Sequence, residues 1–140
     1  MRMLSAVAVA VAISVPGVAR AEEPPAEVIR QIEGFLTSLR DGKVEQAYAD
    51  LFAGTLMSKK QADVDQMVAL TAATTRFCGQ IHDWQLIKAE DFTSSIYDVS
   101  YMIRSEGCPL FFQSVSYNNG KKWSVNYINF TDVYLTAKNW

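Results

Sequence analysis

The chain has few of the residues from which metal sites and most catalytic centres are built. It contains one histidine, His82, and two cysteines, Cys78 and Cys108, among 140 residues. A structural zinc site takes four such ligands, so we expect no metal and no cofactor. The patterns of serine hydrolases, phosphate-binding loops, zinc proteases, dinucleotide-binding folds, heptads and internal repeats are also absent. The sequence therefore names no catalytic residue, which argues only weakly against an enzyme.

Charge of one sign is not concentrated in any stretch. The sequence has 13 basic and 15 acidic residues, for a net charge of −2. The two basic pairs, at 59–60 and 121–122, lie beside expected turns. Nucleic acids and anionic membranes are bound by clustered basic faces. We therefore expect neither of them as a partner.

The chain also lacks an apolar run of the roughly 20 residues that cross a bilayer as a helix. Its longest run, from Ala6 to Val15, follows Arg2 and precedes the small residues Ala19 and Ala21. This pattern is typical of a secretory signal peptide. We place residues 1–21 in the leader and residues 22–140 in a single domain. Because the leader holds two arginines and no acid, its removal changes the net charge to −4, and we expect a soluble periplasmic or secreted protein.

The two cysteines are predicted to form one disulfide. Exported chains meet an oxidising environment in which paired thiols are oxidised, and two free buried thiols are the alternative. In the strand layout proposed below, Cys78 and Cys108 lie at one rim of the sheet but one strand apart, about 10 Å. A disulfide needs Cα atoms within about 7 Å. The two turns must therefore lean together, which Gly79 and Gly107 would permit.

The first half of the domain is predicted to be helical. Apolar residues repeat at helical spacing from Val28 to Leu39, and the pattern stops at Asp41-Gly42. A shorter helix follows and ends at Gly54. A third is expected to begin at Ser58, with Gln61 completing a capping box, and to end near residue 77. Its core-facing residues are expected to be Val64, Met67, Val68, Leu70 and Thr71.

The second half alternates apolar and polar residues through four segments. These are 81–90, 96–104, 110–117 and a final strand from Trp123. We expect an α+β fold in which the N-terminal helices pack on one face of a curved, cone-like, four-stranded antiparallel meander. The residues expected on that covered face are Tyr97, Val99, Tyr101, Ile103, Phe111, Val115, Trp123, Val125 and Tyr127.

The last hairpin allows a prediction of register. A three-residue loop ending at Gly120 would pair Trp123 with Val115, whereas a two-residue loop would bury serine hydroxyls. We therefore expect the longer loop. A bulge is expected near Tyr127-Ile128, because the apolar phase changes there.

One stretch resembles a known superfamily. Phe35-Leu36-Thr37-Ser38-Leu39-Arg40-Asp41-Gly42 followed by Lys43-Val44-Glu45-Gln46-Ala47-Tyr48 is similar to the opening of nuclear transport factor 2-like domains, where an apolar helix, an acidic-Gly turn and an Ala-aromatic helix occur in this order. The resemblance implies a cone of sheet and helices around a pocket, which different members use for catalysis, ligand binding or protein contact. No catalytic acid of such enzymes matches a position in this chain, and small exported members are often non-catalytic.

Aromatic residues supply the remaining candidates for a site. Six of them are expected either to line a ligand pocket or to pack the core, namely Trp84, Tyr97, Tyr101, Phe111, Trp123 and Tyr127. A catalytic pair of His82 or Asp83 with Tyr97 or Tyr101 is the alternative for an isomerase or dehydratase. The terminal Trp140 is either a frayed end or a docking residue.

The function expected from these features is that of an exported binding domain without catalytic activity. It would bind a small molecule or a protein partner through the sheet concavity or an open edge. A pocket enzyme of the isomerase or dehydratase type is one alternative. The other is an inhibitor or an envelope-assembly component, with an exposed apolar patch near Trp140 or an edge strand.

Overall fold

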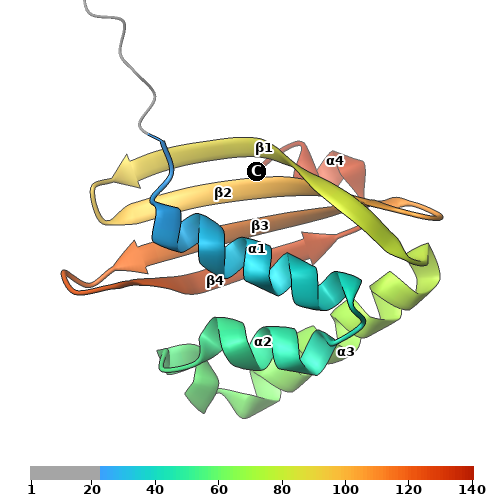
Figure 1. The fold of residues 1–140 in the computed structure, drawn as a ribbon, viewed down its shortest axis with the longest axis horizontal. Helices are drawn as coiled ribbons and strands as arrows, with labels where there is room; N and C mark the ends of the chain where they lie inside the picture. Colours follow the sequence, from blue (N-terminus) through green and yellow to red (C-terminus); the bar gives the residue numbers. More distant parts are fainter. Residues whose placement is uncertain (1–22) are drawn as a thin grey trace, which may run out of the picture.

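The computed structural model describes residues 23–140, so the expected signal peptide lies outside the described residues. Helices come first and an open antiparallel sheet of order β1-β2-β3-β4 follows (Figure 1). The predicted α+β class and the four-stranded meander are confirmed. The elements are α1 (Ala26–Arg40), α2 (Val44–Phe52), a 3-10 turn η1 (Leu56–Lys59), α3 (Gln61–Cys78), β1 (Ile81–Thr93), β2 (Ile96–Ser105), β3 (Pro109–Asn118), β4 (Trp123–Thr131) and α4 (Tyr134–Ala137).

Helix α1 covers one face of the sheet, which we call the inner face (Figure 1). Its buried residues are the five that the helical spacing predicts, and they are Val28, Ile32, Phe35, Leu36 and Leu39. The ring of Phe35 lies 5.2 Å from that of Phe112 on β3. The amphipathic pattern of the sequence is therefore used as expected, to bury one stripe against a sheet.

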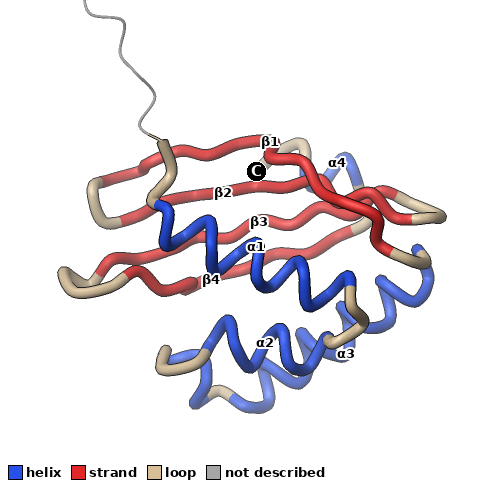
Figure 2. The backbone as a smooth tube through the Cα atoms, in the orientation of Figure 1, coloured by secondary structure: helices blue, strands red, loops and turns tan. Residues whose placement is uncertain are grey.

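Helices α2 and α3 lie beside the β4 edge, and α3 packs on α2 (Figure 2). The predicted capping box is wrong, because Ser58 belongs to η1 and α3 begins at Gln61 without a side-chain cap. The Ser58 hydroxyl instead donates to the carbonyl of Thr55 at 2.7 Å. Of the 18 residues of α3, only Thr71 and Cys78 are buried. Val64, Met67 and Val68 are partly buried and pack against the core, whereas Leu70 is 60% exposed.

The side of β3 that lies on the inner face is not the side that the sequence predicts. Tyr97, Val99, Tyr101 and Ile103 of β2 are buried on the inner face as predicted, but they pair with Ser116, Ser114, Phe112 and Leu110. Phe111 and Val115 therefore point to the opposite, outer face, and their predicted placement is wrong. The prediction assumed that β3 buries one face only. In the structure both faces are covered at this point, since Phe111 packs 6.0 Å from Tyr134 of α4.

The register of the β3–β4 hairpin also differs from the prediction. Trp123 pairs with Asn118, which makes the loop four residues long, and the expected three-residue loop is wrong. Asparagine side chains stabilise this loop: the carboxamide oxygen of Asn119 accepts hydrogen bonds from the backbone N–H of Lys121 and of Lys122 at 3.0 and 3.1 Å. The register that goes with this loop leaves the hydroxyls of Ser114 and Ser116 buried on the inner face.

The predicted bulge in β4 is confirmed. The register shifts between the pairs Ser116–Val125 and Val115–Tyr127, which leaves Asn126 without a partner across the ladder. Val125 and Ile128 are consequently both buried. Tyr127 is 52% exposed, so its predicted place on the inner face is wrong.

The predicted disulfide joins Cys78 to Cys108 with their Cα atoms 5.0 Å apart. The two turns lean together, since the Gly107 N–H donates to the Cys78 carbonyl at 2.7 Å. A Cβ atom on Gly107 would lie 3.1 Å from that carbonyl oxygen, and Gly79 has φ +80°. Both glycines are thus required at this rim.

Candidate functional site

The inner face is packed by side chains at the positions where the sequence predicts a pocket. Tyr97 and Tyr101 are buried, and the ring of Trp123 meets that of Tyr97 edge-on at 6.5 Å. Trp84 lies at the β1 side under the guanidinium of Arg40, 5.2 Å away. Among the described lining residues of the cavities discussed below, none is one of these four aromatics. They serve packing, whereas Phe111 and Tyr127 lie at cavities elsewhere.

The residues weighed for catalysis are not brought together. His82 is exposed, and Asp83 accepts two hydrogen bonds from Arg104 on the surface of β1 and β2. These bonds hold the pKa of the Asp83 carboxyl below its usual range. Burial, followed by the charge of Glu33, raises the pKa of Tyr101 to about 12. A phenol with that pKa stays protonated at neutral pH, as a hydrogen-bond donor must be, but Asp83 pairs with Arg104 on the face of the sheet opposite Tyr101.

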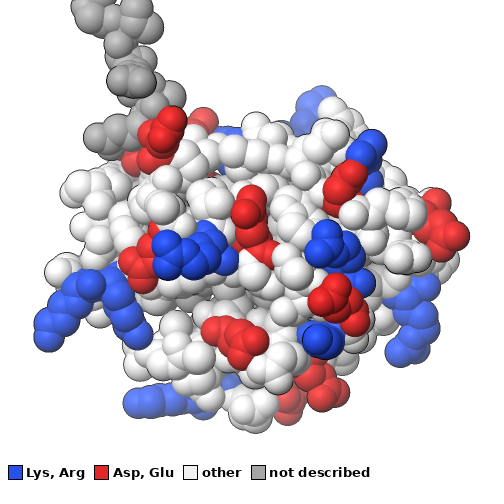
Figure 3. All heavy atoms as spheres, viewed as in Figure 1, with Lys and Arg blue, Asp and Glu red and all other residues white. Residues whose placement is uncertain are grey.

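Within residues 23–140, no group of three or more histidine, cysteine, aspartate or glutamate residues is placed to hold a metal ion. No helix in the same range is both long and apolar enough to cross a membrane. Acidic and basic side chains are interspersed over the face drawn in Figure 3. That face offers no basic patch of the kind that binds nucleic acid.

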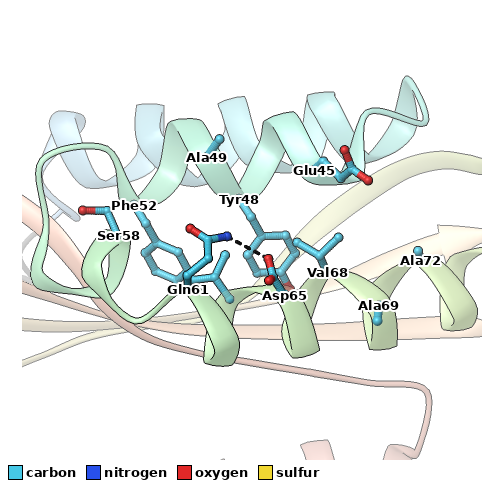
Figure 4. A pocket seen from close by; sticks show the side chains of 11 residues that line it. Glu45, Tyr48, Ala49, Phe52, Ser58, Gln61, Asp65, Val68, Ala69 and Ala72 are labelled. Carbon is cyan, nitrogen blue, oxygen red and sulfur yellow. Dashed lines mark hydrogen bonds between the residues drawn. The ribbon is translucent and has the colours of Figure 1, made fainter.

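A groove of about 650 Å³ lies between α2 and α3 (Figure 4). Tyr48 and Phe52 of α2 point toward α3. Val64, Val68 and alanines of both helices also line the groove. Its charged lining residues are Glu45 and Asp65, and Asp65 accepts a hydrogen bond from Gln61 at 2.7 Å. We call this hollow the α2–α3 groove.

One buried polar contact joins the two helices beneath this groove. The hydroxyls of Tyr48 and Thr71 lie 2.7 Å apart, and both residues are buried. Burial raises the pKa of Tyr48 to about 12, although the bond to Thr71 acts in the opposite direction. The tyrosine is therefore a neutral structural link rather than a reactive group. A further hollow of about 500 Å³ lies on the other side of α3, where Tyr127 is one of its lining residues.

A smaller cavity of about 270 Å³ lies on the outer face of the sheet under α4. We call it the α4 cavity. Its walls are largely apolar, and its lining residues come from β1, β2, β3 and the C-terminal helix with its tail: Ile87, Lys88, Ser100, Phe111, Tyr134, Ala137, Lys138 and Trp140.

Ser100 lines the α4 cavity. It is 3% exposed, and its hydroxyl has no hydrogen-bond partner among the residues that the structure describes. Ser114 and Ser116 on the inner face share this lack of a partner but are not among the described residues that line this cavity. Buried hydroxyls nearly always have a partner, because leaving one unpaired costs about 1–3 kcal/mol. The Ser100 hydroxyl lines a cavity, so its partner is to be sought in whatever fills that cavity.

Two lysines line the same cavity. Lys88 is the cross-strand neighbour of Ser100, and its ammonium lies 3.0 Å from the Glu90 carboxylate. Lys138 is exposed and follows α4 directly. None of the described residues that line the cavity is acidic.

Sequence reasoning missed the α4 cavity because it placed Phe111 on the inner face and took the C-terminal segment for a tail. Trp140 is half-buried and lines the cavity, so it is neither frayed nor free. The sequence did hold one usable signal, because the short C-terminal segment carries two large aromatic residues, Tyr134 and Trp140. Both of them line the cavity. Ser100 itself has no signature in the sequence.

Comparison of this chain with protein-family models, with curated proteins and with solved structures gave no match. The likeness to nuclear transport factor 2-like domains stays a prediction.

Proposed function

We propose that the chain is an exported, non-catalytic binding domain that holds a small, mainly apolar ligand in the α4 cavity. The observation that carries this proposal is the unpaired, buried hydroxyl of Ser100 within apolar walls. Ligand sites combine such walls with a few polar groups that orient the ligand. A volume of about 270 Å³ suits a molecule somewhat smaller than a typical drug.

Export is supported by the leader pattern of the sequence and by the disulfide between Cys78 and Cys108, since structural disulfides persist in oxidising compartments. The resemblance to nuclear transport factor 2-like domains fits a binding role but adds no residue to it. The proposed site also differs from the pocket that the resemblance implies, because it lies outside the helix-covered face.

The α4 cavity is tested with a neutral aromatic probe, 2-naphthamide. Its addition to the full chain should shift the side-chain N–H signal of Trp140 in a nitrogen-15 NMR spectrum. The corresponding signals of Trp84 and Trp123, which lie on the inner face, should stay in place. The variant Ala137→Phe fills the cavity and should abolish the shift.

A matched variant, Ala69→Phe, adds the same side chain to the α2–α3 groove and should leave the Trp140 response intact. Two results would refute the proposal. One is a Trp140 signal that does not respond to the probe, and the other is a response that survives in the Ala137→Phe variant.

A second candidate function is protein contact through α3, as an inhibitor or envelope-assembly component would make. It is favoured by the exposure of two large apolar side chains of α3, Leu70 at 60% and Phe77 at 81%. The acidic rim of the adjoining α2–α3 groove suits a basic amphipathic helix as the occupant. Here Ala69→Phe should weaken binding of such a peptide and Ala137→Phe should not, which is the reverse of the pattern above.

A further inference from the structure

We infer that the ligand of the α4 cavity is a small apolar molecule with one carboxylate group. This inference rests on the proposed function and adds the charge of the ligand to it. Its basis is the position of three polar groups, Ser100, Lys88 and Lys138, around otherwise apolar walls.

Ser100 and Lys88 are placed to bind the same functional group of the ligand. They are direct cross-strand partners on β2 and β1, and both line the cavity. Side chains of such partners leave the sheet on the same face with Cβ atoms about 5 Å apart. A carboxylate between them would accept a hydrogen bond from the Ser100 hydroxyl and lie close to the Lys88 ammonium. Lys138 reaches the cavity from the other side, beyond α4.

The other charged groups on this face do not fill that role. Glu90 is the present partner of Lys88, but its side chain is 63% exposed, whereas that of Lys88 is 31% exposed. Such an exposed ion pair contributes little. Glu90 also stands opposite Asp98, another carboxylate, and Asp98 accepts a hydrogen bond from Gln113 at 3.0 Å. Lys88 is therefore free to exchange Glu90 for a ligand anion at low cost.

Other ligand classes fit less well. A neutral polar group would satisfy Ser100 but would gain no charge pairing with the two ammonium groups. A cation would be repelled by Lys138, and none of the described lining residues is acidic and could bind it. The apolar part of the ligand would pack between Phe111, Tyr134 and Trp140.

The experiment compares three probes of nearly equal shape, 2-naphthoate, 2-naphthamide and 2-naphthylmethylamine, by NMR titration of the Trp140 side-chain signal in the full chain. We expect naphthoate to bind about tenfold more tightly than naphthamide, since a partly exposed charge pair contributes up to about fivefold per lysine. The protonated amine should bind most weakly.

Four variants locate the effect. Lys88→Met and Lys138→Met should each weaken naphthoate binding about three- to fivefold and leave naphthamide binding unchanged. Glu90→Gln should strengthen naphthoate binding, because it frees Lys88. Lys121→Met, in the exposed β3–β4 loop, removes the same charge away from the cavity and should change nothing.

The outcomes separate this inference from the proposed function. Equal affinity for naphthoate and naphthamide, or a loss that is as large for Lys121→Met as for the cavity lysines, would overturn the carboxylate assignment while the cavity remained a ligand site. A Trp140 signal that responds to none of the three probes would overturn both.

Discussion

Besides the disulfide at Cys78, the hydrogen bond between Tyr48 and Thr71 ties α3 to the rest of the protein. Its two oxygens are 2.7 Å apart, and both residues are about 1% exposed. Tyr48→Phe removes one partner and leaves the Thr71 hydroxyl buried and unpaired. The free energy of unfolding should fall by about 1–3 kcal/mol, the cost of such a group. Thr71→Val should have a similar effect for the converse reason.

The double variant distinguishes this explanation from simple loss of packing. With both hydroxyls removed, no buried polar group is left unpaired, and the combined loss should be smaller than the sum of the single losses by about 2 kcal/mol. Thr74→Val provides the control, because the hydroxyl of Thr74 bonds only to the Leu70 carbonyl of its own helix at 2.9 Å. We expect that change to stay within about 0.5 kcal/mol.

The assay is urea unfolding followed by circular dichroism for the wild type and the four variants. Hydrogen exchange adds the location of the effect: the amides between Gln61 and Thr71 should exchange faster in Tyr48→Phe, whereas those near Cys78 stay protected by the disulfide. Losses that simply add in the double variant would refute the reasoning. Amides that exchange at the same rate along the whole of α3 in Tyr48→Phe would also refute it.

Two further predictions concern the disulfide and the buried phenols. Replacing Cys78 and Cys108 together by alanine should lower the free energy of unfolding by about 3.6 kcal/mol, because the disulfide no longer restricts a loop of 30 residues in the unfolded chain. Urea unfolding measures this loss, and a loss below about 1 kcal/mol would contradict this account. Burial raises the pKa of Tyr48 and Tyr101 from 10.0 to about 12, so the folded state holds these protons more tightly than the unfolded chain, and stability should fall as pH rises from 10 to 12. Tyr48→Phe should flatten this decline in a series of urea titrations at rising pH, and an equally steep decline in that variant would count against the assignment.

The helical half of the domain was readable from the sequence because its signals are local. The apolar stripe from Val28 to Leu39 and the breaks at Asp41-Gly42 and Gly54 depend only on residues within the same helix. The start of α3 was not readable in this way. Ser58 and Gln61 have the spacing of a capping box, but the backbone around Thr55 forms a 3-10 turn that uses the Ser58 hydroxyl first.

The order of the strands in the sheet was predictable from the sequence. Which residues of each strand face α1 was not predictable throughout. Alternation in β2 identifies its inner face, because Asp98 and Arg104 are polar where Tyr97 and Ile103 are apolar. In β3 the apolar residues fall on both faces, and local alternation cannot say which face meets α1. The structure places Ser114 and Ser116 inward at 0% exposure, a choice set by pairing with β2 and by the hairpin loop. Phe111 was misplaced for this reason, and Tyr127 was misplaced because the bulge at Asn126 turns it to the outer face.

The outer face explains both why β3 is apolar on two sides and why a site lies there. Phe111 is buried on that face under α4, while Tyr117 on the same face is 44% exposed. The cover therefore ends partway along the strand. A four-residue helix is too short to fill the width of the sheet as α1 does on the inner face, so its side chains bridge the gap at a few points and leave the α4 cavity between them. Ser100 lies where this thin cover leaves a hydroxyl without a hydrogen-bond partner among the described residues. An incomplete second layer thus accounts for the cavity and its apolar walls, and it makes this region, rather than the packed inner face, the place to look for a ligand.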